Sequence, residues 1–316
     1  MNVPRWLQRF RRDATASAQS RPVEALTRGV VSEADWKRPG VRWTMRTVHT
    51  LLLVFLIISC IGPLFLMVKF AVTPTQDILR TPLALFPNGI RWENMVLAWN
   101  KVQVSKYFWN TVVIAGGSWF FQLLVATTGG FVISVLRPKW SKVLNSLVMV
   151  TLFIPSVVLL VPLYLTVLNP PLLGQSLLNS FWAIWLPAGA SAFNVVIVTR
   201  FFDSLPREVF EAAEVDGAST FRLFWSVVLP MSKPILGVVS VFAFIAAWKD
   251  FLWPMLVLKR AEIQPLSVRL PAIQAREDLG VFLAALTIST LIPMVIFLIF
   301  QKLFLSGAGM SGAVKG

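Results

Sequence analysis

Charged residues are scarce in this chain, and acidic residues are the scarcer kind. Only 14% of the 316 residues are charged, with 15 Asp and Glu against 29 Lys and Arg, whereas 56% are hydrophobic. A soluble domain of this length needs more polar surface to cover itself. The composition therefore predicts a membrane protein. A basic excess on one side of a membrane accounts for the net charge of +14 without nucleic acid.

Residue types that carry catalysis or bind metals are also nearly absent. The one cysteine, Cys60, lies inside an apolar run, and the one histidine, His49, lies just before it. Neither an internal disulfide nor a cysteine-based metal site can form from these residues. The sequence has no Gly-x4-Gly-Lys-Ser/Thr phosphate loop, nucleophile elbow or catalytic dyad. We therefore expect a chain that is not an enzyme and that binds no cofactor or metal itself.

Long apolar runs dominate what remains. Six of them, each 24 to 27 residues long, are long enough as helices to cross a hydrocarbon core of about 30 Å. They are approximately Val48–Val72, Asn110–Leu136, Val143–Leu168, Leu177–Phe202, Ile235–Leu258 and Leu279–Leu305. The predicted fold is an all-α integral membrane protein with six transmembrane helices. Glycines at Gly116–Gly117 and Gly129–Gly130 predict close helix contacts rather than breaks.

Lys and Arg are distributed unevenly between the two sides of these spans. Nineteen lie in the two termini and in the loops at 137–142 and 203–234, with the adjoining span edges included, whereas eight lie in the opposite loops. Cytoplasmic loops are enriched in Lys and Arg, so we expect both termini on the cytoplasmic side of the cell membrane. The predicted organisation is a basic tail over 1–47, in contact with membrane lipids or disordered, a six-helix domain over 48–305 and a Gly-rich cytoplasmic tail over 306–316.

A charged segment, FEAAEVDGASTFRLFWSVVLPMSKP, separates two of the apolar runs. Pro206 suits the first turn of a helix, which would stop at Gly217 because glycine adopts the left-handed conformation at low cost. Ser219 is a suitable N-cap for a second helix that ends before Pro230. Two short helices at the cytoplasmic surface would then either dock on a partner protein or form a solvated loop without a partner.

Two prolines interrupt the third span. Pro155 and Pro162 each remove a helix hydrogen bond, and the freed carbonyls must face protein or a water-filled cavity. This helix therefore either lines a pathway or reflects the general frequency of proline in membrane helices.

The fifth span contains two charges, Lys249 and Asp250, with Trp248 and Trp253 beside them. A charge at the bilayer centre costs about 2.5–3.5 kcal/mol, so each is expected to face the bundle interior or a polar cavity. Polar groups beside aromatic faces suit a sugar, whose hydroxyls form hydrogen bonds and whose C–H face stacks on a ring. The alternative is an ion pair to another helix with interfacial tryptophans.

The charged segment resembles the EAA motif of the permease subunits of bacterial ABC importers. The matching residues are Glu211, Ala212, Ala213, Asp216, Gly217, Ala218, Leu229 and Pro230. The resemblance implies a type I ABC importer permease fold whose cytoplasmic coupling helix, in the 203–234 loop, sits in a cleft of an ATPase. It also implies a second homologous permease subunit, two copies of that ATPase, which bind ATP and Mg, and an extracytoplasmic solute-binding protein.

The form EAAxxDGAS looks most like the carbohydrate-importing branch, the maltose-type permeases. Three other stretches agree with this branch. Its Pro-x6-Pro-Leu pattern is similar to FIPSVVLLVPLYL, and its Trp-Asn-acid-Phe-x-x-Pro stretch is similar to AWKDFLWPMLVL. The tail of its second, shorter permease subunit is similar to SGAGMSGAVKG. The resemblance covers roughly 48–316 and implies a sugar-like solute. Lys249 departs from the pattern, which has Asn there, so a cation at this position would favour an anionic solute or pair with a partner's carboxylate.

Three alternatives remain at this point. The first is a permease for another solute class, such as amino acids or phosphate. The second is an ion-coupled secondary transporter, and the third is a membrane-embedded enzyme. A secondary transporter needs several acids buried in its spans, whereas only Asp250 qualifies. An embedded enzyme needs clustered acids or histidines near the membrane surface, and the sequence contains no such cluster.

Overall fold

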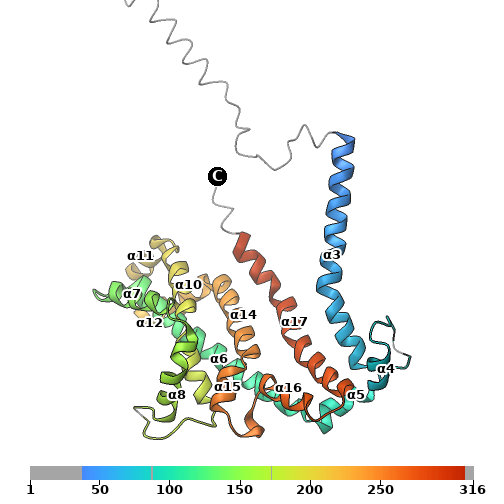
Figure 1. The fold of residues 1–316 in the computed structure, drawn as a ribbon. Coiled ribbons are helices and arrows are strands. Elements are labelled where there is room, and N and C mark those ends of the chain that lie inside the picture. Colours follow the sequence, from blue (N-terminus) through green and yellow to red (C-terminus); the bar gives the residue numbers. More distant parts are fainter. Residues whose placement is uncertain (1–37, 87, 172, 310–316) are drawn as a thin grey trace, which may run out of the picture. The chain divides into compact units, whose positions relative to one another are not determined.

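The computed structural model describes residues 38–86, 88–171 and 173–309, and within these ranges it contains helices and loops but no strands (Figure 1). The predicted all-α class is confirmed. The chain forms two units that divide between Phe65 and Leu66. Residues 1–37 of the predicted basic tail and 310–316 of the predicted C-terminal tail lie outside the described residues.

The first unit contains, in its described part, helix α3 (Pro39–Ala71) as far as Phe65. None of residues 39–65 is buried, and large apolar side chains are exposed on all sides, with Leu51, Phe55 and Ile58 each about two-thirds exposed. A helix that is hydrophobic all round is typical of a segment covered by lipid or by other membrane helices. It begins at Pro39, ahead of the predicted start at Val48.

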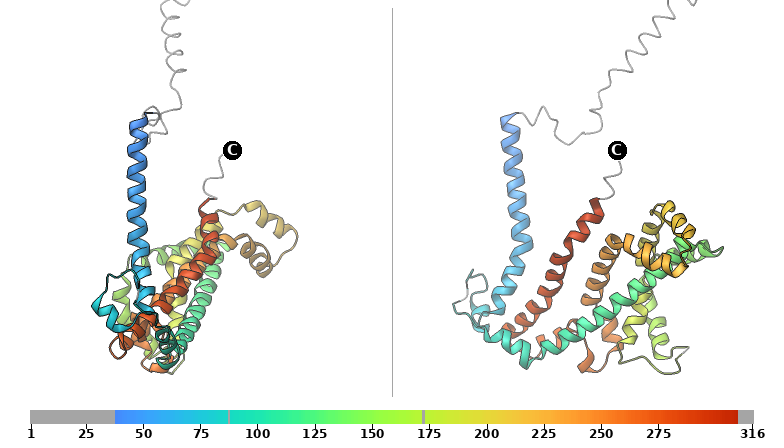
Figure 2. Two further views of the ribbon diagram at one scale, coloured as in Figure 1. Left: turned by 90° about the vertical axis from the view of Figure 1, so that its right-hand side faces the viewer. Right: turned by 180° about the vertical axis from the view of Figure 1, so that it is seen from behind.

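The second unit is built around α6 (Val104–Phe131), which continues through the π-helical turn η3 (Val132–Leu136). Helices α9 (Trp182–Gly189), α10 (Ala192–Asp203) and α14 (Lys233–Lys249) pack against α6, and α17 (Leu279–Gly309) packs on α14 (Figure 2). The shorter elements are α4 (Thr75–Arg80), α5 (Glu93–Val96), η2 (Leu97–Lys101), α7 (Ser141–Thr151), η4 (Ser156–Leu159), α8 (Leu160–Leu168), α11 (Arg207–Val215), α12 (Thr220–Arg222), η5 (Leu223–Val228), α13 (Leu229–Met231), α15 (Leu252–Val257), η6 (Ala261–Ile263) and α16 (Leu266–Gln274).

The third predicted span is a bent pair rather than one helix. Its two halves, Ser141–Thr151 and Ser156–Leu168, meet at 102°. The bend lies at Pro155, whose backbone is extended (φ −58°, ψ 129°) and which precedes the 3-10 turn η4. Proline disfavours helical geometry in the residue before it and has no N–H to continue the ladder, which accounts for the break here. Pro162, by contrast, lies inside α8.

The fourth predicted span is also divided, with a 42° bend between α9 and α10. Gly189 ends α9, and Ser191 begins α10 by accepting a hydrogen bond at its hydroxyl from the Asn194 N–H (3.4 Å). A serine N-cap satisfies a donor that would otherwise be unpaired at the start of a helix.

The fifth predicted span breaks at its charges. Helix α14 ends at Lys249, Asp250 is extended (φ −65°, ψ 126°), and α15 begins at Leu252. The Asp250 carbonyl, freed from the helix ladder, accepts a hydrogen bond from the Ser267 hydroxyl (2.6 Å). The prediction of one continuous helix over 235–258 is therefore wrong, and the break places an exposed backbone turn inside an apolar region.

Helix α6 passes through both glycine pairs without a break, as predicted, but only some of these glycines make close contacts. A methyl group at Gly130 would meet a Val198 side-chain carbon at 3.1 Å and the Thr199 nitrogen at 3.3 Å on α10. One at Gly117 would overlap the Trp185 ring, whereas one at Gly116 would meet nothing within 4 Å. Close helix packing therefore depends on specific glycines.

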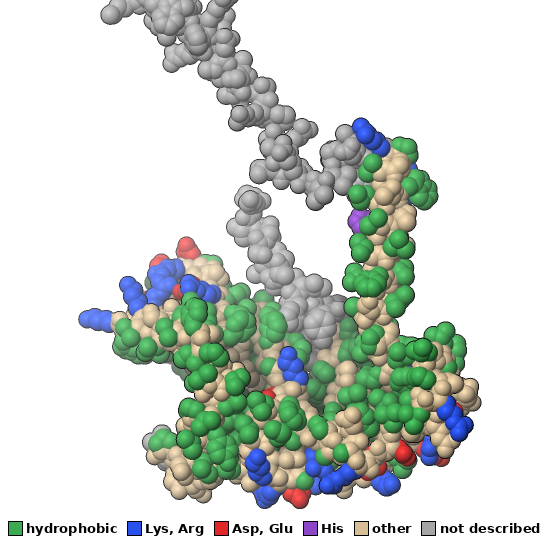
Figure 3. Space-filling model, in the orientation of Figure 1, with side chains coloured by type: hydrophobic (Ala, Val, Ile, Leu, Met, Phe, Trp, Pro, Cys, Tyr) green, Lys and Arg blue, Asp and Glu red, His purple; other side chains and the backbone are tan. Residues whose placement is uncertain are grey.

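The loops of the second unit gather at two opposite ends, as expected when successive spans cross in alternating directions. At one end Arg137 pairs with Asp203 (2.9 Å), which joins the 137–142 loop to the end of α10. At the other, Asn179 accepts hydrogen bonds from the N–H groups of Lys259 (2.7 Å) and Arg260 (3.0 Å). Basic side chains gather at both ends in Figure 3, with a mainly hydrophobic surface between them.

The contact at Gly130 generates a stability prediction. Gly130→Leu should lower the free energy of unfolding by about 1–3 kcal/mol, because its side chain overpacks the α6–α10 interface. The matched Gly116→Leu variant should leave it nearly unchanged. Thermal unfolding of the detergent-solubilised protein, followed by tryptophan fluorescence, measures both. Equal destabilisation by the two variants would contradict this packing.

Candidate functional site

The charged segment forms a helix that ends at a glycine. In the last turn of α11 the Ala218 N–H donates to the Ala213 carbonyl (2.9 Å) and the Gly217 N–H donates to the Glu214 carbonyl (3.0 Å). Gly217 has φ +73°, and a methyl group on its Cα would meet no atom within 4 Å. This pair of bonds is the Schellman motif, which requires a left-handed residue at this point. The predicted helix end at Gly217 is confirmed.

The second helix of the segment starts as expected but continues further. The Ser219 hydroxyl accepts a hydrogen bond from the Arg222 N–H (3.3 Å), which confirms Ser219 as an N-cap. The chain then passes through the π-helical turn η5 and α13, which ends at Met231, so the prediction that the helix ends before Pro230 is wrong. Pro230 lies in the first turn of α13, a position that proline tolerates because an N–H there has no partner within the helix.

Helix α11 rests on the rest of the unit through few side chains. Phe210 and Ala213 pack against the apolar cluster that contains Phe202, Leu223 and Val228. No residue of α11 is buried, and Val215 is 88% exposed. Glu208, Glu211, Ala212, Glu214 and Asp216 are all exposed. The helix thus offers an acidic surface, while its apolar side holds it on the bundle.

An ion pair fixes the base of this segment. Asp203, at the end of α10, accepts hydrogen bonds at one carboxylate oxygen from the Ser134 hydroxyl (2.8 Å) and from Arg137 Nη2 (2.9 Å). Arg137 also donates from Nε to the Ser134 carbonyl (2.6 Å). From the sequence, Arg137 was predicted only as a loop cation, and Ser134 and Asp203 were not identified, because residues 66 or more positions apart give no local signal of their pairing.

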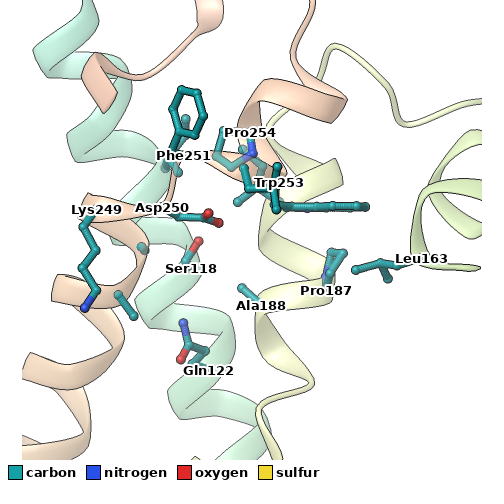
Figure 4. A pocket seen from close by; sticks show the side chains of 15 residues that line it. Ser118, Gln122, Leu163, Pro187, Ala188, Lys249, Asp250, Phe251, Trp253 and Pro254 are labelled. Atoms are coloured by element: carbon teal, nitrogen blue, oxygen red, sulfur yellow. The ribbon is translucent and has the colours of Figure 1, made fainter. Parts of the chain in front are cut away.

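A cavity of about 670 Å³ lies among α6, α8, α9, α14 and α15 (Figure 4). Its lining is largely apolar, and the polar residues on it are Ser118, Gln122, Lys249 and Asp250. Its volume falls within the range of about 300–1,000 Å³ that is typical of small-molecule sites. The break between α14 and α15 forms one of its walls.

The two charges of the broken fifth span lie differently around this cavity. Figure 4 shows the Asp250 carboxylate on the same side as the Ser118 hydroxyl, whereas the Lys249 side chain extends away from Asp250. Lys249 is exposed and Asp250 is half-buried. No ion pair joins these two described residues.

Two polar residues of the second span, Ser118 and Gln122, were not predicted from the sequence. The Gln122 side-chain oxygen accepts a hydrogen bond from Asn194 Nδ2 (2.8 Å), which links α6 to α10. The Ser118 hydroxyl is buried without a hydrogen-bond partner in the described structure. Polar residues four positions apart in an apolar run share one helix face, and this spacing was the available signal.

Of the tryptophans and prolines predicted to line the pathway, only one tryptophan lines the cavity. Trp253 lines the cavity and donates from Nε1 to the Ala183 carbonyl (3.0 Å). Trp248 lies outside the cavity lining, where it stacks on Phe244 and donates to the Ser289 carbonyl (3.3 Å). Pro155 and Pro162 do not line the cavity either, although Leu163, the residue after Pro162, does. The geometry brings Lys249, Asp250 and Trp253 together and leaves Trp248 and both prolines apart.

The chain resembles known membrane transport proteins over most of its length. Residues 126–308 match the family described as "Binding-protein-dependent transport system inner membrane component". The chain is 30% identical over 284 residues to the probable ABC transporter permease protein YurM of Bacillus subtilis, covering 88% of this chain and 92% of that protein. It is 27% identical over 277 residues to the arabinooligosaccharides transport system permease protein AraQ of the same organism, covering 86% and 96%.

The fold is similar to that of a solved structure. That structure is the crystal structure of a bacterial ABC transporter involved in the import of the acidic polysaccharide alginate. The match has a TM-score of 0.72 and 20% sequence identity, and it covers 86% of this chain and 98% of the chain in that structure. This likeness confirms the predicted permease fold. Together with the family match, it shows that the chain is a multi-pass membrane protein that belongs to the inner membrane component family of binding-protein-dependent transport systems.

Proposed function

We propose that this chain forms, with a second homologous permease, the translocation pathway of an ATP-driven importer for a sugar or sugar-like solute. Family membership supports a role in a transporter complex. The solute class is supported by the arabinooligosaccharide system of the relative AraQ and by the carbohydrate-type motifs of the sequence. A solute-binding protein outside the cell delivers the solute, and two copies of a cytoplasmic ATPase bind ATP and Mg and supply the energy.

The observation that carries this proposal is the exposed acidic helix α11 with its glycine end. Its C-terminal turn is held by the Schellman bonds at Gly217 and Ala218, and its side toward the bundle is held by Phe210. A short rigid helix with a polar outer face suits docking into a cleft of another protein. When ATP binding closes the ATPase dimer, movement of this coupling helix passes to α10 and to η5, between which it lies in the chain.

The proposed orientation places α11 and both termini in the cytoplasm. Taken together with the two termini, the loops at 137–142 and 203–234 carry more Lys and Arg than the opposite loops, and the Arg137–Asp203 pair joins these two loops at one end of the unit. Excess Lys and Arg marks the cytoplasmic side of a bacterial membrane protein.

The solute is proposed to pass through the cavity beside Asp250. The carboxylate accepts hydrogen bonds from hydroxyl groups, and the neighbouring apolar wall with Trp253 suits the C–H face of a sugar ring. Lys249, which stands where the maltose-type pattern has Asn, lies on the lining too and adds a donor that favours acid-bearing sugars.

The function is tested with the purified complex in proteoliposomes. ATP hydrolysis by the co-purified ATPase should rise when the binding protein and its sugar are added, and the sugar should accumulate only when ATP is present. Accumulation driven by an ion gradient without ATP would contradict the proposal. A screen of sugars, amino acids and phosphate against the binding protein identifies the solute class.

A substitution at the helix end tests coupling. Gly217→Pro should leave membrane insertion intact but weaken association with the ATPase at least tenfold, because proline cannot adopt φ +73° and removes the N–H bonded to Glu214. Gly174→Pro is the matched control, since Gly174 also has positive φ (+64°) and open space but lies in a loop of the opposite side. Co-purification of the ATPase measures both, and full association of Gly217→Pro would refute the coupling assignment.

A charge removal tests the pathway. Asp250→Asn should raise the solute concentration needed for half-maximal uptake about tenfold, because a hydrogen bond to a charged group is worth about 1.5–3 kcal/mol. Asp278→Asn is the control, since Asp278 is exposed and outside the cavity lining. Uptake kinetics in proteoliposomes measure KM and kcat for each. Unchanged kinetics in Asp250→Asn would remove this residue from the pathway.

A further inference from the structure

A second cavity lies at the end of the unit that carries α11. It has a volume of about 480 Å³ and is enclosed by the turn after η3, the start of α7 and the last turns of α10. Four cations line it, namely Arg137, Lys139, Lys142 and Arg200, together with a single carboxylate, Asp203. The cavity beside Asp250 is separate from this hollow, which shares only the Arg137–Asp203 pair with the base of α11.

The charges in this cavity are not balanced. Asp203 is already paired with Arg137 at 2.9 Å and holds the Ser134 hydroxyl at the same oxygen. Lys139, Lys142 and Arg200 form no ion pair within the described residues. These three side chains are solvent-exposed, and an anion bound among them would reduce the repulsion between their charges. The cavity therefore carries an excess of three positive charges.

The start of α7 adds donors on the same side. Trp140, at the N-cap position, provides no side-chain hydrogen bond to this 11-residue helix. The Ser141 N–H donates to the Pro138 carbonyl (2.8 Å), so the N–H groups of Lys142 and Val143 are the ones without a capping side chain. Lys142 belongs to this first turn, and Asn145, one turn later, is another lining residue. Free N–H groups at a helix start favour an anion with several oxygens, and the surrounding lysines reinforce that preference.

The outer surface of α7 is apolar directly beside these charges. Val143, Leu147 and Val150 are each about 60% exposed, and Trp140 is 56% exposed at the start of the helix. Valine and leucine side chains on the outside of a helix suit acyl chains, and tryptophan is enriched where a membrane meets water. The same helix thus presents a site for an anionic group at its start and a surface for hydrocarbon along its length.

We propose that this cavity binds the headgroup of an anionic phospholipid, with the phosphodiester on Lys139, Lys142 and Arg200 and the acyl chains along α7. Basic hollows between membrane helices on the cytoplasmic side are suited to such headgroups. With the proposed orientation, the lipid belongs to the cytoplasmic leaflet. Arg137 and Asp203 also line a third, separate cavity, which Glu211 and Glu214 of α11 line from its other side. A bound headgroup would therefore lie next to the base of the proposed coupling helix.

The test measures lipid retention by the purified complex, with phosphatidylglycerol and phosphatidylcholine as the probes. The complex is equilibrated with mixed micelles of the two lipids, and the lipid that stays bound is counted by native mass spectrometry. The variant carries Lys139→Gln, Lys142→Gln and Arg200→Gln. The matched control carries Lys101→Gln, Lys106→Gln and Lys233→Gln, which remove the same charge from exposed positions outside the cavity.

The wild-type complex should retain phosphatidylglycerol in preference to phosphatidylcholine, and the cavity variant should lose that preference at least tenfold, because each surface cation contributes about a fivefold effect. The control should stay within twofold of the wild type. Equal losses in both variants, or no loss in either, would overturn the proposal. The three single substitutions, each expected to weaken retention about fivefold, provide the same test if the triple variant unfolds.

A soluble anion is the competing source of the phosphate group. Inorganic phosphate is therefore added to the lipid-loaded complex in increasing concentration. Retention of phosphatidylglycerol at millimolar phosphate supports a lipid site. Displacement below that concentration assigns the cavity to a soluble phosphate and overturns the lipid proposal. Because the assay measures bound lipid and requires no transport, its outcome is independent of whether the solute is a sugar.

Discussion

The backbone of a chain in lipid has no water to bond with, so each N–H and C=O that leaves a helix must find a partner inside the protein. This constraint accounts for the polar side chains found at the breaks in the fourth and fifth spans. At the break in the fifth span, the Asp250 carbonyl accepts a hydrogen bond from the Ser267 hydroxyl. At the break in the fourth span, the Ser191 hydroxyl caps the start of α10. Each of these interruptions is therefore accompanied by a nearby polar side chain, and the break at Asp250 forms a wall of the central cavity.

The same constraint separates the charges of the second unit into two places. Most lie at the two ends, where the Arg137–Asp203 pair and the bonds to Asn179 tie together loops that are far apart in sequence. Only Lys249 and Asp250 lie beside the cavity among the helices. A largely apolar cavity with one carboxylate and one cation fits the proposed passage of solutes rich in hydroxyl groups, because few fixed charges would need to be desolvated.

Helix α11, the proposed coupling helix, combines rigidity with weak attachment. Its glycine end is fixed by two backbone bonds, yet no residue of α11 is buried and only Phe210 and Ala213 contact the apolar cluster beneath it. Its anchorage to the bundle comes from α10 through Asp203 and from η5 through Leu223 and Val228. Force applied to the acidic surface is thus passed to two helices that both pack near α6.

The sequence alone determined the number of apolar runs, the glycine end at Gly217 and the cap at Ser219, because span length, left-handed backbone and capping depend on a few neighbouring residues. It did not determine the bends at Pro155 and Asp250, the continuation of the helix through Pro230, or which of Trp248 and Trp253 faces the cavity. Nor did it reveal that Ser134, Arg137 and Asp203 form one network. Those features depend on which distant side chains accept the freed backbone groups and fill the space between helices, and only the tertiary structure brings these partners together.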